Sequence, residues 1–307
     1  MMTTGVRCSA NELRYGVYEG VITRLYKMLN GVSNHEALNC GGGAESDLAD
    51  DLAARLLLAA KRLESAGVSS ADGCVDYSQV ARSEAFAEYV QLTQRLRAFD
   101  LQSLTTQEER KAFWINLYNA LVIHAVIAYR PARSIRAVRA VFDRAAYVVD
   151  GLRFSANDIE HGILRANAGH PVFFREQFAP DDPRRLFVLE SLDARLHFAL
   201  NCAARSCPPI RFYDAKLLNA QLDVAARSFV NGGGVVIEKA TRTIYLSRIF
   251  SWYARDFGSA LFGYRRAAQL VLYAAQYLDD AELRQYTADR ADNMRVRFLQ
   301  YDWTLNG

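Results

Sequence analysis

The sequence predicts a mainly helical α+β fold with a small antiparallel sheet built from hairpins. Three observations lead to this prediction: apolar residues recur at helical spacing along most of the chain, capping residues precede several of these stretches, and two alternating segments carry hairpin turn signals. The Gly/Ser-rich stretch 67–73 marks a boundary just before Val75. We therefore expect a helical N-terminal extension over residues 1–75 and a main domain over residues 76–307.

The N-terminal extension contains two segments in which apolar residues recur at helical spacing, 10–31 and 48–66. A polar stretch with three consecutive glycines, 41–43, lies between them and is typical of a flexible linker. The second segment places leucines at near-heptad spacing, at Leu48, Leu52, Leu56 and Leu58. The N-terminal helices are therefore the candidate surface for a protein partner.

Four further helices are predicted along the main domain after a first one over 79–98. Thr106 and Glu109 form a capping box ahead of a long apolar helix that ends before Pro131. Three short polar residues can cap the helices that follow, namely Ser155 for 156–167, Asp193 for 194–203 and Asp214 for 215–230. Helices thus account for most of the predicted structure.

The strands are few and short. A hairpin is expected over 146–155, where Asp150-Gly151 is the turn signal, and a second hairpin is expected over 235–247. Residues 295–303 also have strand spacing. We expect residues 298–306 to be packed into the main domain, near the cluster that includes Asn116 and His197, with Asn306 bonded to a neighbouring loop.

The composition excludes several classes of protein. Of 307 residues, 37 are Lys or Arg and 34 are Asp or Glu, and the resulting charge of +3 gives no basic excess for binding nucleic acid. The longest apolar run, 120–129, is about half a membrane span, and the first residues lack a secretory signal pattern. Five cysteines are too sparse for a disulfide framework. We expect a cytoplasmic protein without a nucleic-acid or membrane partner.

Candidate chemistry begins on the helix over 113–124, which is apolar on every side and should therefore be buried. Its polar side chains, Asn116, Asn119 and His124, must find partners inside the domain. Two interpretations are open. The asparagines bind a ligand, or they bond the backbone of a neighbouring segment and fix the core.

A second cluster lies in residues 158–165. At helical spacing, Asp158, His161 and Arg165 share one face, which we expect to be exposed to solvent, while Glu160 points the opposite way among apolar residues. A carboxylate in an apolar setting needs a basic partner or stays protonated. Glu160 is therefore either a general acid or base or the anion of a structural ion pair.

The third cluster spans residues 192–209. Asp193, His197 and Asn201 lie four residues apart and form a polar stripe on a helix, whereas Cys202 is about 140° away from His197. If the helix ends near residue 203, Cys207 can fold back towards His197, and a thiol near an imidazole is a route to a reactive nucleophile. The alternative is that both cysteines are small buried residues.

Other cofactor and metal chemistry is not indicated. His197, Cys202 and Cys207 are of suitable type for zinc, but neither CxxC nor HExxH spacing occurs. No dinucleotide-binding, Walker A or GxSxG motif is present. The sequence thus predicts no metal and no cofactor.

Five sequence blocks resemble the domain of unknown function 547, in the order of that family: 113–120, 157–165, 197–209, 249–258 and 301–306. The resemblance covers about 76–307 and assigns motif positions to Trp114, Asn116, Asn119, Glu160, Arg165, His197, Cys202, Cys207, Tyr301, Asp302, Trp303 and Asn306. Ala203 and Ala194 depart from the glycine and proline that are common there. The family includes plant proteins with a leucine zipper that are labelled ternary complex factors. It implies no particular reaction.

These clusters together favour a cysteine-dependent amide hydrolase or acyl transferase acting on a small molecule or peptide. Cys207, or else Cys202, would be the nucleophile and His197 the base. Asp193 or Asn201 would orient the imidazole, and Asn116 or Asn119 would donate to a developing oxyanion. The alternative is a non-catalytic interaction or scaffold domain in signalling that binds its partner through the N-terminal helices.

Overall fold

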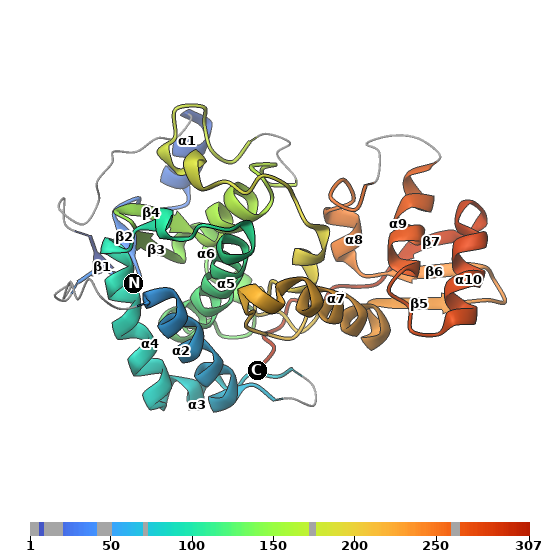
Figure 1. Cartoon of the computed structure of the whole chain (residues 1–307), viewed down its shortest axis with the longest axis horizontal. Helices are drawn as coiled ribbons and strands as arrows, with labels where there is room; N and C mark the ends of the chain where they lie inside the picture. The colour runs from blue at the N-terminus through green and yellow to red at the C-terminus, as the bar shows by residue number, and fades with distance from the viewer. Residues whose placement is uncertain (1–5, 9–20, 42–50, 70–72, 172–175, 259–264) are drawn as a thin grey trace. The chain divides into compact units, whose positions relative to one another are not determined.

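Helices supply most of the regular structure in the computed structural model (Figure 1), which describes residues 6–8, 21–41, 51–69, 73–171, 176–258 and 265–307. The predicted mainly helical α+β fold with small sheets is confirmed. The chain divides into two compact units. The first unit comprises Met1–Ser191, Leu200–Leu218 and Trp303–Gly307, and the second comprises Leu192–Ala199 and Asn219–Asp302.

The core of the first unit is built around the long helix α5, Gln107–Tyr129. The predicted capping box is present, because Thr106 Oγ1 accepts from Glu109 N and Glu109 accepts from Thr106 N. Helices α2 (Leu52–Gly67), α3 (Tyr77–Arg82) and α4 (Glu84–Arg95) pack against one another, and α2 and α3 also pack against α5. The predicted helix 79–98 is divided at Ser83, whose hydroxyl caps α4.

Helix α5 is long and apolar enough to cross a membrane by length and composition alone. However, 83% of the relevant window is buried inside the first unit. Its hydrophobicity is therefore explained by its place in the core, as the uniform apolar character of 113–124 predicts.

The described residues before residue 75 belong to the first unit. Strand β1 (Val6–Arg7) pairs with β2 (Glu36–Ala37), and α1 (Val21–Leu29) lies between them in sequence. Asn39 is fully buried and bonds Val148 through both ends of its amide. The division between the two units does not fall at the predicted boundary near residue 75, since α2 lies in the first unit, and the extension over residues 1–75 with a main domain over 76–307 stays a prediction. Parts of the predicted helices and linkers, including Leu48, lie outside the described residues.

Cys8 and Cys40 form a disulfide that joins β1 to the residues after β2. The cysteine count predicted no disulfide framework and did not anticipate this single bond. The pairing was not readable from spacing because 32 residues separate the two cysteines, and β1 and β2 bring them together. The low cysteine count therefore gives no support to a cytoplasmic location, which stays a prediction.

The rest of the first unit is the predicted hairpin and short helical turns. Strands β3 (Ala146–Val149) and β4 (Leu152–Ser155) are antiparallel, with Asp150 and Gly151 at positive φ in the turn. Helix α6 (Val141–Arg144) precedes the hairpin, and a π-helix, Asp158–Leu164, follows it. The 3-10 turns of both units are Leu96–Ala98, Leu101–Ser103, Ile135–Ala137, Pro183–Phe187, Ala194–Phe198, Ala215–Leu217 and Ala291–Asn293.

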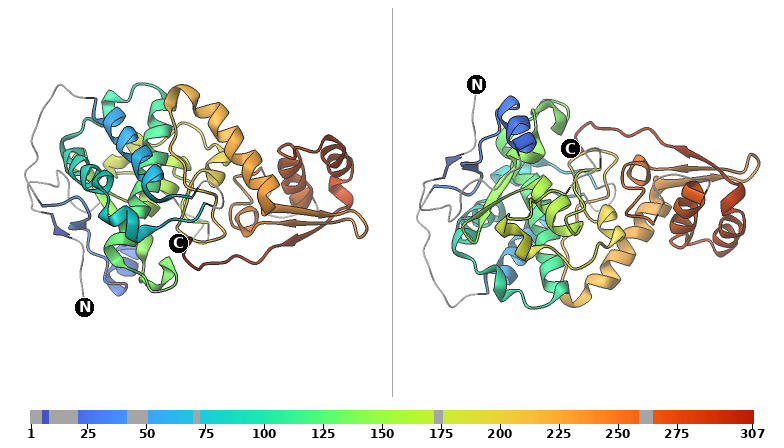
Figure 2. Two further views of the ribbon diagram at one scale, coloured as in Figure 1. Left: turned by 90° about the horizontal axis from the view of Figure 1, so that it is seen from below. Right: turned by 90° about the horizontal axis from the view of Figure 1, so that it is seen from above.

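Among its described residues, the second unit contains α7 from its second residue onward, a mixed sheet and helices α8, α9 and α10, and Figure 2 shows these elements from two further directions. The helices are α7 (Leu218–Phe229), which runs into a π-turn at Val230–Gly234, α8 (Arg248–Trp252), α9 (Arg265–Ala275) and α10 (Ala281–Asp289). The strands are β5 (Val235–Glu238), β6 (Thr243–Leu246) and β7 (Arg295–Phe298). Strands β5 and β6 form the predicted hairpin, but β7 pairs parallel to β6. The pairing of β7 departs from the antiparallel sheet expected from hairpins, because β7 returns after helices α8, α9 and α10 and not through a tight turn.

Candidate functional site

A loop in the first unit holds the two cysteines of the third sequence cluster face to face. The sulfurs of Cys202 and Cys207 are 2.7 Å apart, and the backbone N–H of Cys202 donates to Cys207 Sγ at 3.1 Å. Both cysteines are half-buried. An N–H donated to sulfur favours the thiolate over the thiol, which is the nucleophilic form of cysteine. We call residues 201–208 the cysteine loop.

Local bonds give the cysteine loop its shape. Asn201 donates from Nδ2 to Pro208 O at 2.6 Å, and its Oδ1 accepts from Ala203 N at 2.7 Å. Cys207 N donates to Ala204 O at 2.9 Å. Ala203 has a φ of +63°, a conformation that favours glycine, which accords with the glycine common at this position in the family that the sequence resembles. The chain thus folds back on itself within six residues.

Two asparagines of helix α5 bond the backbone of the cysteine loop and of the residues that follow it. Asn119, fully buried, accepts from Asn201 N at 3.0 Å and donates to Arg211 O at 3.0 Å. Asn116 donates to Tyr213 O and accepts from Tyr213 N, each at 2.7 Å. Both amides therefore bond neighbouring backbone, which is the second of the two interpretations left open by the sequence. In this arrangement Asn119 positions the cysteine loop, and Asn116 positions Tyr213, which follows it.

The last residues of the sequence close the other side of the cysteine loop. Asn306 is buried, and it donates from N to Ala203 O at 3.1 Å while its side-chain Oδ1 accepts from Tyr77 OH at 2.6 Å. Arg205 N donates to Thr304 O at 2.8 Å. Burial, followed by the nearby Cys207 and Cys202, raises the pKa of Tyr77 well above its usual 10, so this phenol stays protonated. Of the residues 298–306 that were expected to pack into the domain, Asn306 is buried, Tyr301 and Trp303 are half-buried, and Phe298, Gln300, Asp302 and Thr304 are exposed, so the expected burial holds at Asn306 and not for the whole segment.

His197 lies in the second unit, and its partner there is Asp256, a residue that the sequence analysis did not identify. Its Nε2 is 2.8 Å from Asp256 Oδ2, both side chains are buried, and the Tyr253 ring stacks on the imidazole at a centroid distance of 3.9 Å. Asp256 and Tyr253 belong to the block 249–258, which the sequence had marked without assigning either residue. Their separation from His197 by more than fifty positions leaves no spacing signal.

The residues expected to orient the imidazole have other contacts. Asp193 caps the turn that carries His197 and pairs with Arg195 at 2.8 Å. Asn201 bonds within the cysteine loop. The predicted polar stripe does not form, because the helix expected over 194–203 is only a 3-10 turn that ends at Phe198. His197 and Cys207 belong to different units, and their pairing as a Cys–His centre stays a prediction.

Glu160 and Arg165 lie in a buried cluster on the π-helix. Tyr118 OH donates to Glu160 Oε2 at 3.1 Å, and Arg165 donates to Gly169 O and, at 3.1 Å, to His161 Nδ1. The same nitrogen of His161 lies 3.7 Å from Glu160 Oε1. The His170 ring meets His161 edge-on at 5.0 Å, and burial lowers the pKa of His170.

The expectation of a solvent-exposed face with Asp158, His161 and Arg165 is wrong, because all three residues are buried. The α-helical spacing on which it depended does not apply, since the segment is wound as a π-helix. π-Turns occur frequently at functional sites. In this π-helix, however, the contacts of Asp158 are structural.

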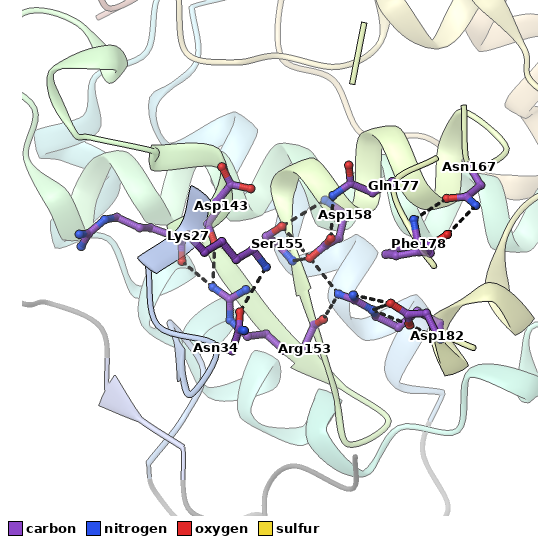
Figure 3. A network of polar contacts seen from close by, with 12 residues as sticks. Lys27, Asn34, Asp143, Arg153, Ser155, Asp158, Asn167, Gln177, Phe178 and Asp182 are labelled. Atoms are coloured by element: carbon purple, nitrogen blue, oxygen red, sulfur yellow. Dashed lines mark hydrogen bonds and ion pairs between the residues drawn. The ribbon is translucent and has the colours of Figure 1, made fainter. Parts of the chain in front are cut away.

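Asp158 is the centre of a polar network that Figure 3 shows from close by. It accepts from Ser155 N and Oγ at 2.9 and 2.7 Å and from Gln177 Nε2 at 3.0 Å, and it pairs with Arg184 at 3.0 Å. The buried Lys27 adds positive charge, and together these groups hold the pKa of Asp158 well below its usual value. The network joins α1, β4 and the segment 176–185.

His124, a candidate binding residue, is buried in the core of the first unit. Its Nδ1 is 2.9 Å from Tyr147 OH, and the Phe86 ring meets it edge-on. Burial lowers the pKa of His124 from 6.5 to about 4, so it is neutral at pH 7. Its position gives it a role in packing.

The pKa of His124 makes the protein less stable in mild acid. Between pH 6.5 and about 4 the unfolded chain binds a proton that the folded His124 refuses, so unfolding becomes easier as the pH falls. This group should cost about 3 kcal/mol of stability over that interval. Urea titrations at several pH values should show a steeper loss for wild type than for His124→Gln, whereas the matched change of the exposed His35, His35→Gln, should leave the slope unaltered. Equal slopes for wild type and His124→Gln would contradict the predicted effect of His124 on stability in acid.

Two sequence predictions remain, namely that there is no metal site and that the N-terminal helices offer a surface for a partner. Among the residues that the structure describes, no group of three His, Cys, Asp or Glu side chains is arranged to hold a metal ion. Of the near-heptad leucines, Leu52 and Leu56 are buried within the first unit and Leu58 is exposed. The stripe of α2 is thus mostly used internally.

A comparison with known families matches residues 101–230 to the family described as "Protein of unknown function, DUF547". The matched span contains α5, the π-helix, His197 and the cysteine loop. The match supports the family resemblance of the sequence. Searches of curated proteins and of solved structures each found no match.

Proposed function

We propose that this protein is a thiol-dependent enzyme in which Cys207 is the nucleophile. The proposal depends on one observation, the N–H of Cys202 donated to Cys207 Sγ at 3.1 Å on a loop braced from both sides. A structural cysteine needs no such donor, whereas a nucleophile gains from it because the donor stabilises the thiolate. Half-burial leaves the sulfur within reach of a substrate.

Acyl transfer is the reaction class that a single activated thiolate serves most directly. The Cys207 sulfur attacks the carbonyl carbon of an amide or ester, the leaving amine or alcohol departs with a proton, and a thioester remains on the enzyme. Water or a second acceptor then attacks the thioester and restores the thiol. The proposed substrates are accordingly small molecules or peptides with an acyl group, as for an amide hydrolase or acyl transferase.

The structure provides a matched internal control for this proposal. Cys74 likewise forms no disulfide, is half-buried and lies in the first unit. At pH 7 we expect iodoacetamide to alkylate Cys207 about tenfold faster than Cys74 in the folded, reduced protein, because alkylation rates follow the thiolate fraction. Trypsin separates the two sites, since Cys207 lies on the peptide 206–211 and Cys74 on 63–82, so mass spectrometry gives both rates in one sample.

A reactive ester distinguishes a nucleophile from a merely acidic thiol. Incubation with p-nitrophenyl acetate should release a burst of nitrophenol and leave a hydroxylamine-sensitive acetyl group on peptide 206–211. Cys207→Ser should lose the burst, and Cys74→Ser should keep it. Equal alkylation of Cys207 and Cys74, or a burst that survives in folded Cys207→Ser, would refute the proposal.

A further inference from the structure

We propose that Cys202 and Cys207 form a reversible disulfide, which makes the cysteine loop a redox-controlled site. The sulfurs are already 2.7 Å apart, so closure to a bond of about 2.05 Å needs a movement of well under 1 Å. No backbone rearrangement of the loop is required for the two side chains to meet. The formation of the disulfide is independent of the function proposed above. The loss of enzyme activity that the disulfide would cause, by occupying the Cys207 sulfur, rests on that function.

The bracing of the cysteine loop favours the disulfide over separated thiols. Asn201 ties Ala203 to Pro208, and Cys207 N bonds Ala204 O, so the residues between the cysteines form a closed turn. Asn306 and Asn119 hold this turn from outside. Because the geometry is fixed before oxidation, the loss of chain entropy on closing the bond is small. The raised pKa of Tyr77, to which both cysteines contribute, agrees with their close grouping beside a protonated phenol.

The two sulfurs also differ in their surroundings, which assigns the order of steps. Cys207 Sγ accepts the N–H and is therefore the attacking thiolate, and Cys202 is the resolving thiol. Cys207 attacks one sulfur of a small disulfide such as glutathione disulfide, whose S–S bond breaks and releases one glutathione. The Cys202 sulfur then attacks Cys207 Sγ and releases the second glutathione. Two electrons pass to glutathione disulfide, and the two thiol protons end on the two glutathione molecules.

The experiment equilibrates the full-length protein in glutathione buffers of increasing oxidation, followed by an acid quench and alkylation of the remaining thiols. Trypsin cuts after Arg205, between the two cysteines, so the disulfide appears as peptides 196–205 and 206–211 joined together. We expect this linked species to grow with oxidation, to disappear on reduction, and to lower the alkylation of Cys207 about tenfold or more. Cys74→Ser should behave as wild type does.

Two variants keep the test informative. In Cys202→Ser, Cys207 should end as a mixed disulfide with glutathione, because the resolving thiol is missing. In Cys207→Ser, Cys202 should stay alkylatable under the same buffers. A linked pair that includes Cys74, or complete alkylation of Cys202 and Cys207 at every redox ratio, overturns the inference.

The two proposals fail in different ways. If both cysteines stay reduced while Cys207 is still the fast-reacting thiol, the redox inference falls and the proposed function stands. If the disulfide forms reversibly while reduced Cys207 reacts no faster than Cys74, the redox inference stands and the proposed function falls.

Discussion

Replacing Asp158 by asparagine should lower the free energy of unfolding by about 3–5 kcal/mol, the cost of removing one member of a buried ion pair. Four donors converge on this carboxylate, from the Ser155 N–H and hydroxyl, Gln177 and Arg184. An asparagine offers one oxygen, and its NH₂ group must face donors that it cannot satisfy. Arg184 keeps Asp182 as a partner, at 2.7 Å, so the penalty arises mainly at the unsatisfied donors.

The matched control for Asp158 is Asp181, an exposed aspartate next to Asp182. Asp181→Asn should change stability by less than about 0.5 kcal/mol. A cycle of Asp158→Asn, Arg184→Met and the double variant, followed by urea denaturation, should give a coupling energy of about 1–3 kcal/mol. If Asp158→Asn has the melting temperature of the wild type, the polar network of Figure 3 contributes nothing to stability and the predicted loss is wrong.

The Asp158 carboxylate also makes the free energy of unfolding depend on pH in acid. A group whose pKa is depressed by folding adds stability above its unfolded pKa, here near 3.8, and that stability is lost as the pH falls towards the lower folded value. The difference between wild type and Asp158→Asn should therefore be constant above about pH 5 and should shrink below pH 4. A difference that persists unchanged to pH 2 would show that the charge of Asp158 is not what matters.

Local signals explain the parts of the fold that could be predicted from sequence. The capping box of Thr106 and Glu109 and the Asp150-Gly151 turn join residues at most three positions apart, so their chemistry is visible in the sequence itself. The burial of α5 also follows from a pattern confined to that helix. These features fix the fold class and most element positions.

Partners that are distant in sequence could not be predicted in the same way. Asp256 reaches His197 and Tyr77 reaches Asn306 only after helices and strands have packed. Asp158, at the start of the π-helix, similarly bonds Gln177 and Arg184, which lie about twenty or more residues further along the chain, so no spacing rule contains these contacts. For the candidate site, the sequence identified the cysteines, while the 3-10 turn at Ala194–Phe198 changed which residues surround His197.

Removing residues 303–307 should be at least as damaging as the loss of Asp158. Five hydrogen bonds disappear: Asn306 with Ala203, Tyr77 and Val75, Thr304 with Arg205, and Leu305 with Arg133. At about 1 kcal/mol each they amount to about 5 kcal/mol, which is comparable to the whole stability of many domains. Near-ultraviolet circular dichroism should show lost tertiary structure, and Cys202, Cys207 and Cys74 should all become rapidly alkylated.

A milder pair of variants tests the same contact if the shortened chain does not fold. Tyr77→Phe and Asn306→Ala each break the 2.6 Å bond between these side chains, and each should cost about 1–3 kcal/mol. The double variant should cost less than the sum of the two, because both remove one shared interaction. Asn293→Ala, at an exposed asparagine, is the control and should be neutral. A shortened chain with an unchanged melting temperature would mean that residues 303–307 do not hold the cysteine loop, and the brace on which Cys207 depends would then lie in Asn201 and α5 alone.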